Sequence, residues 1–195
     1  MDPIELARQH ARRLHDEAVQ RGRDPWSPYE FAVGIANDLG ITVETCAPGA
    51  ALLDGGRASF DPDLPLIVHE TGGSPFDQAF LVAHEIGHAE LGDGEEGPEP
   101  AAQIDPTRTS EAAPVGMDRV VDYSRRQRRE VQMDLFAREL LLPRPVALAL
   151  HVAQGQTCSN IVARLGAPFE VVAQQMLDAL LLPALPVVAA AAPVE

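Results

Sequence analysis

The chain has few cysteines, no lysine and no long uninterrupted apolar run. Its two cysteines, Cys46 and Cys158, lack the spacing of a metal-binding pair, which argues against both a disulfide framework and a cysteine-based zinc site. All 15 basic residues are arginine, and the net charge of -14 argues against direct nucleic-acid binding, which depends on clustered cations. This charge is better suited to a basic protein partner.

We also expect neither a membrane-spanning nor a secretory segment. The N-terminus contains Asp2, Glu5 and several arginines, so it lacks the apolar core of a signal peptide. Near the other end, Pro183, Pro186 and Pro193 interrupt the apolar residues. We therefore expect a cytoplasmic protein without a membrane anchor, and a chain of 195 residues can bury the core of one domain.

The most informative motif that is present is HEIGH, at residues 84 to 88. On a helix, His84 and His88 lie about one turn apart on the same face, so both imidazoles can bind one ion. Glu85 lies at the edge of that face, where it can accept a proton from metal-bound water. The spacing predicts two zinc ligands and a general base. The alternative is an amphipathic helix with two incidental histidines.

The residues around this motif predict where its helix begins and ends. Ser74 is the expected N-cap, Pro75 the first helical residue, Asp77 the capping-box partner and Gly92 the end. Apolar residues recur between them at helical spacing. We therefore expect the motif to lie on a helix that packs against the core.

A third ligand is expected from the apolar helical segment 129–143. Glu130 and Asp134 lie one turn apart on it and interrupt its apolar pattern. Glu130 can ligate zinc, while Asp134 can accept the second N–H of a ligating histidine and so fix its orientation. The alternative is a solvated edge at which these carboxylates pair with nearby arginines.

The segments FLVAHEIGHAELG and EVQMDLFARELLLP together resemble the ImmA/IrrE family of bacterial HExxH zinc metallopeptidases. The resemblance extends over roughly residues 27 to 182 and includes the upstream segment SPYEFAVGIANDLGITVE. It implies an α+β, zincin-like (gluzincin-type) core with a small mixed or antiparallel sheet. It also implies that His84, His88 and Glu130 bind the metal and that Glu85 is catalytic. Met133 departs from the family pattern, which usually has alanine at this position.

The resemblance implies a zinc-dependent endopeptidase with one Zn²⁺ per chain, and Mn²⁺ is the main competing ion. Glu85 would take a proton from the zinc-bound water and deliver it to the leaving amine. The expected partner is a specific protein substrate, with a DNA-binding repressor of a stress response or of mobile-element regulation as one candidate. The alternative is a non-catalytic metal-binding sensor or interaction module that regulates a fused or separate partner.

The chain divides into an N-terminal helix (1–23), a metallopeptidase domain (24–182) and an Ala/Pro-rich tail (183–195) that could link to a fused downstream domain. Within the domain, residues 92–118 contain seven acidic residues and one arginine, and we expect a mobile acidic loop that acts as a lid or as a passive insertion. Residues 146–182 predict a helical subdomain resembling a helix-turn-helix. Its last helix has no cations, which favours structural packing over DNA contact.

Short strands are expected at residues 41–45, 51–53, 57–60 and 66–69, separated by Gly-Gly and Asp-Pro turns.

Four further residues have weaker assignments. Tyr123 and His69 are candidate donors to the oxyanion of a tetrahedral intermediate, although a structural role is also open for His69. His10 and His15 lie on the charged first helix, where we expect them to face solvent.

Overall fold

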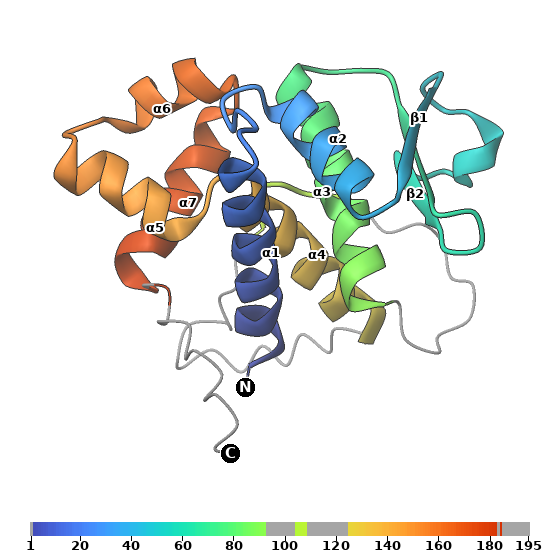
Figure 1. Ribbon diagram of the computed structural model, residues 1–195, viewed down its shortest axis with the longest axis horizontal. Helices are drawn as coiled ribbons and strands as arrows, with labels where there is room; N and C mark the ends of the chain where they lie inside the picture. Colours follow the sequence, from blue (N-terminus) through green and yellow to red (C-terminus); the bar gives the residue numbers. More distant parts are fainter. Residues whose placement is uncertain (1, 93–103, 109–124, 183, 185–195) are drawn as a thin grey trace, which may run out of the picture.

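The computed structural model describes residues 2–92, 104–108, 125–182 and 184, which form an α+β fold. A small sheet lies on one side of the molecule and the helices α5 to α7 lie on the other (Figure 1). The helices α1, α3 and α4 occupy the middle, and each contributes several residues to the buried apolar core. Among the described residues, no helix combines the length and the apolarity needed to cross a membrane.

Helix α1 (Pro3–Gln20) begins at Asp2, whose side chain accepts a hydrogen bond from the Ile4 amide. It packs lengthwise on α4, and α2 (Pro28–Asp38) packs on α3. The expectation that His15 faces solvent is wrong, because its side chain lies in the α1–α4 interface and is only 4% exposed. Its Nδ1 donates to the Leu140 carbonyl at 2.8 Å, which satisfies the buried ring nitrogen.

The sheet contains β1 (Thr42–Cys46), β2 (Ala58–Asp61) and β3 (Leu66–Glu70) in the order β1-β3-β2. Strands β1 and β3 are parallel and β2 and β3 are antiparallel, so the sheet is mixed. Three expected strands are confirmed to within one residue. The side of β3 that carries Ile67 and His69 is buried, and α3 packs against β2 and β3.

The strand expected at residues 51–53 is wrong. These residues form a 3₁₀ turn, η1 (Ala51–Leu53), in which the Leu53 amide donates to the Ala50 carbonyl at 3.0 Å. Gly49 has a φ of 72° and Asp54 is in the left-handed region, so the chain turns at both ends of the segment. The backbone therefore curls around the buried Leu53 instead of extending along the sheet.

Helix α3 (Pro75–Leu91) carries the HEIGH motif and has the expected boundaries. Ser74 and Asp77 form the reciprocal capping box, and the helix ends at Gly92, whose φ is 68°. Residues 79–87 are all buried, because α2, α4 and the sheet surround this part of α3. The motif thus lies on a central helix, which is more enclosed than an amphipathic surface helix.

Helix α4 (Arg125–Leu141) crosses α3 at Gly87. A Cβ atom added at Gly87 would lie 2.9 Å from Met133 Sδ and 3.1 Å from Phe136 Cδ1. The missing side chain therefore allows the close approach of the two helices that carry the expected ligands. Met133 fills the space at this crossing and is fully buried, in agreement with helix packing as its role.

The C-terminal part consists of α5 (Arg144–Leu148), a π-helical turn η2 (Ala149–Ala153), α6 (Cys158–Leu165) and α7 (Phe169–Leu181). Helix α6 ends at Gly166, and residues 166–168 connect it to α7. Helix α7 packs on α5 and also touches α4. These contacts connect the last helices to the helix that carries Glu130.

Candidate metal centre

Helices α3 and α4 bring His84, His88 and Glu130 together. The Nε2 atoms of His84 and His88 lie 3.1 Å apart, and His84 Nε2 lies 3.3 Å from Glu130 Oε2. All three ligand atoms are within 4.8 Å of one another. This group could therefore hold a metal ion.

The spacing of these atoms fits a tetrahedral ion. Zinc bonds of about 2.0 to 2.2 Å place neighbouring ligand atoms about 3.2 to 3.6 Å apart. The two short distances from His84 Nε2 lie at this value or just below it, and the third separation is at most 4.8 Å. Two imidazole nitrogens and one carboxylate also form a donor set typical of catalytic zinc sites, which leave one position for water.

His84 is oriented by Asp134. Its Nδ1 donates to Asp134 Oδ1 at 2.9 Å, and both side chains are almost completely buried. This hydrogen bond holds a proton of the imidazole ring on Nδ1. In the neutral ring the lone pair is then on Nε2, the nitrogen that lies beside the other two ligands. Asp134 is thus the hydrogen-bond partner of His84.

The surroundings of His84 favour a positive charge. Burial by itself lowers the pKa of His84, but the hydrogen bonds with Asp134 and Glu130 and the charge of Glu85 raise it to about 10. The same carboxylates would favour a metal cation at this position, which would then replace the proton on Nε2.

Glu85 follows His84 on α3 and its side chain is nearly buried, with 6% exposure. Its charge is one of the causes that raise the pKa of His84, its neighbour in the sequence. Glu130 and Asp134 are also buried, at 8% and 2% exposure, so neither lies on the solvated edge considered as their alternative. The site thus combines three ligand atoms with an additional carboxylate.

Asp134 also contacts residues that the sequence did not indicate. Its Oδ2 accepts a hydrogen bond from the Asp105 amide at 3.1 Å and lies 2.6 Å from Arg108 Nε. Burial raises the pKa of Asp134, and the contacts with His84, Arg108 and the Asp105 amide oppose this shift. The only available signal was compositional, since Arg108 is the one arginine in the acidic segment 92–118.

Of the two candidate oxyanion donors, the structure describes only His69. Both ring nitrogens of His69 are engaged away from the ligand group: Nδ1 donates to the Glu70 carbonyl at 3.0 Å, and Nε2 accepts from the Tyr29 hydroxyl at 3.0 Å. Burial lowers the pKa of His69, in agreement with a neutral ring. These contacts favour the structural role. Tyr123 lies outside the described residues.

Comparisons with protein-family models, curated proteins and solved structures gave no match to this chain. The resemblance to the ImmA/IrrE family therefore rests on the two motifs and stays a prediction.

Proposed function

We propose that this protein is a zinc-dependent endopeptidase with a zincin-like (gluzincin-type) core. The observation that carries the proposal is the meeting of His84, His88 and Glu130, with ligand atoms within 4.8 Å, on the buried helices α3 and α4. A site with only a structural role would have no need of an adjacent carboxylate such as Glu85. Zn²⁺ fits this donor set, and Mn²⁺ is its main competitor.

The protein residues have distinct roles in this proposal. His84, His88 and Glu130 would hold the ion, and Asp134 keeps His84 in the tautomer that can ligate. A bound zinc ion would supply a Lewis acid and lower the pKa of its water to about 7. Glu85 then accepts the proton of the attacking water and delivers it to the leaving amine.

The proposed substrate is a specific protein, and a DNA-binding repressor remains one candidate because of the family resemblance. An enzyme with one target would show little activity on generic peptides. The search for cleavage therefore has to start from a complex protein mixture.

A Glu85→Gln variant provides the test. Wild type and variant, each loaded with zinc, are incubated with a proteome extract, and new protein N-termini are identified by mass spectrometry. We expect cleavage by the wild type and a loss of about 10²- to 10⁴-fold in the variant, with unchanged metal content. Equal cleavage by the two proteins would contradict the proposed role of Glu85. Metal binding without cleavage by the wild type would favour a non-catalytic sensor or interaction module.

A further inference from the structure

Residues 104–108 form a short segment that is fixed to the body of the protein at several points. Ile104 packs against the hydrophobic core, and the Asp105 amide donates to Asp134. Within the segment, Asp105 Oδ1 accepts hydrogen bonds from the Thr107 amide at 2.9 Å and from the Thr107 hydroxyl at 2.7 Å. The segment is therefore a defined turn held against α4, although its composition alone suggested a loop without fixed structure.

This turn contacts Asp134 on the oxygen that does not face the metal site. Oδ1 accepts from His84, whereas Oδ2 is held by the Asp105 amide and lies beside the Arg108 guanidinium. A carboxylate held at one oxygen alone can rotate about its side-chain bonds. Contacts at both oxygens fix that rotation and thereby the direction in which Oδ1 meets the imidazole.

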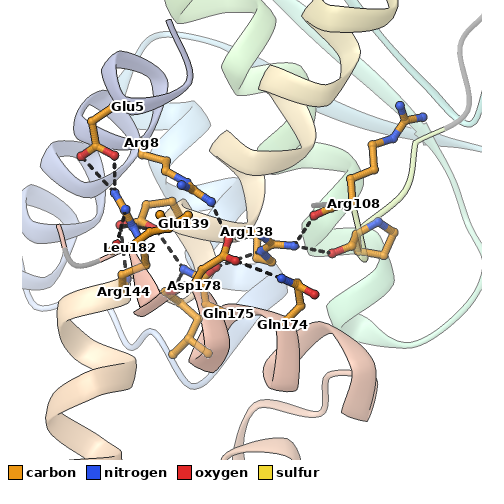
Figure 2. A network of polar contacts seen from close by, with 12 residues as sticks. Glu5, Arg8, Arg108, Arg138, Glu139, Arg144, Gln174, Gln175, Asp178 and Leu182 are labelled. Carbon is orange, nitrogen blue, oxygen red and sulfur yellow. Dashed lines mark hydrogen bonds and ion pairs between the residues drawn. The ribbon is translucent and has the colours of Figure 1, made fainter. Parts of the chain in front are cut away.

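Arg138, one helical turn after Asp134 on α4, also holds the turn. Its Nη1 donates to the Arg108 carbonyl at 2.6 Å, while Nε donates to Gln175 Oε1 at 2.9 Å and Nη2 donates to Asp178 Oδ2 at 2.6 Å (Figure 2). Because Gln175 and Asp178 lie on α7, this guanidinium joins α7 to the turn. Arg138 is 2% exposed, so its planar group has little freedom to leave these partners.

We propose that residues 104–108 are a positioning element of the metal centre, in which Arg108 and the Asp105 amide hold Asp134 in the orientation that fixes His84. Arg138 is the positioning residue that holds this element in place. The inference rests on the metal-binding part of the proposed function and is independent of peptide hydrolysis. It predicts that a residue without direct contact to the ligands alters metal affinity.

The test measures zinc affinity by competition with a chromophoric chelator, together with the visible spectrum of the Co²⁺-loaded protein, which reports ligand geometry. Arg108→Met removes the charge beside Asp134, and Arg108→Lys retains it. Arg23→Met is the matched control, because Arg23 pairs with Asp38 at the same distance of 2.6 Å but has no contact with the ligand group. The side chain of Arg108 is 22% exposed, so its replacement need not disrupt the core.

We expect Arg108→Met to weaken zinc binding by about three- to tenfold, less than the effect of removing a direct partner of a ligand, and to shift the Co²⁺ spectrum. Arg108→Lys recovers part of the loss, and Arg23→Met matches the wild type. Without metal, Arg108→Met and Arg23→Met should have thermal denaturation midpoints within about 3 °C of each other. This comparison separates a positioning role from general destabilisation. Arg108→Gln replaces Arg108→Met if the latter does not fold.

Two outcomes overturn the inference in different ways. Unchanged affinity and an unchanged Co²⁺ spectrum in Arg108→Met, beside a wild type that binds zinc, would refute the positioning role and leave the proposed function intact. A wild type that binds neither ion would refute the metal site and the positioning role together.

Discussion

Two buried polar groups include residues of α4, and they differ in how their atoms face each other. In the arginine network formed by α1, α4, α5 and α7, each carboxylate meets N–H donors. Asp178 Oδ2, for example, accepts from Arg8 at 2.5 Å and from Arg138 at 2.6 Å (Figure 2). In the ligand group, acceptor atoms meet one another, since His84 Nε2 lies 3.1 Å from His88 Nε2 and 3.3 Å from Glu130 Oε2.

This difference separates a structural group from a cation site. Buried carboxylates and guanidinium groups that satisfy each other need no further charge. Converging lone pairs repel unless a proton or a metal ion lies between them. Burial lowers the pKa of His84, but its hydrogen bonds with Asp134 and Glu130 and the charge of Glu85 raise it to about 10, so the surroundings favour a cation there. Both groups contain buried carboxylates, so burial alone does not distinguish them, whereas the direction of the donors and acceptors does.

The largest expected effect comes from a substitution that breaks the arginine network. Asp178→Ala leaves Arg8 and Arg138 without their shared carboxylate in a region where their exposure is 3% and 2%. We expect a loss of about 3 to 5 kcal/mol in the free energy of unfolding, measured by urea denaturation of the metal-free protein. A loss below about 1 kcal/mol would mean that the two arginines are satisfied without Asp178.

A second change separates the helices that carry the ligands. Gly87→Ala would force Met133 and Phe136 away from α3, at a cost of about 1 to 3 kcal/mol, and should also weaken zinc binding because Glu130 moves relative to His84. Gly72→Ala is the control, since the nearest atom to its added Cβ, on Pro48, is 3.8 Å away. Equal unfolding curves for the two variants would show that α3 and α4 do not need this close approach.

A third change acts on the bond between His84 and Asp134. Asp134→Asn keeps the shape of the side chain but removes its charge, and we expect zinc affinity to fall about tenfold to a hundredfold, as chelator competition would show. Asp38→Asn, at a surface carboxylate that also pairs with an arginine, should leave zinc affinity unchanged. If both variants bound zinc as tightly as the wild type, Asp134 would have no part in orienting the ligand.

The smallest expected effect concerns His15, whose pKa is shifted in the direction opposite to that of His84. Burial lowers the pKa of His15, so the folded state resists its protonation while the unfolded state, with a pKa of about 6.5, accepts a proton. The wild type should lose stability as pH falls below about 6.5. His15→Asn can keep a donor to the Leu140 carbonyl without titrating, so its deficit relative to the wild type should shrink at acidic pH. A deficit that is constant from about pH 7.5 to 5 would rule out this titration.

Local signals in the sequence predicted the parts of the fold that depend on neighbouring residues. The capping box at Ser74 and the stop at Gly92 bound α3 as expected, and three of the four expected strands are present. His84 and His88 share one turn of a helix, so their proximity follows from spacing alone.

Tertiary contacts explain what the sequence did not reveal. His15 is buried because α4 packs against that face of α1, and Arg108 reaches Asp134 because the 104–108 segment returns to α4. Arg108 belongs to no periodic pattern, whereas His15 has helical spacing with the buried Ala11 and Ala18 and was assigned to the surface from its residue type. The segment at 51–53 curls because left-handed backbone at Asp54 redirects it, a conformation that its residue types did not indicate.

The most direct test of the central claim is the metal content of the purified protein, measured by elemental analysis beside His84→Ala, Glu130→Ala and the control His151→Ala, an exposed histidine outside the ligand group. We predict about one ion per chain in the wild type and in the control, and a loss of the ion in both ligand variants. A wild type without metal under conditions that retain zinc, or an ion that persists in Glu130→Ala, would contradict the proposed centre.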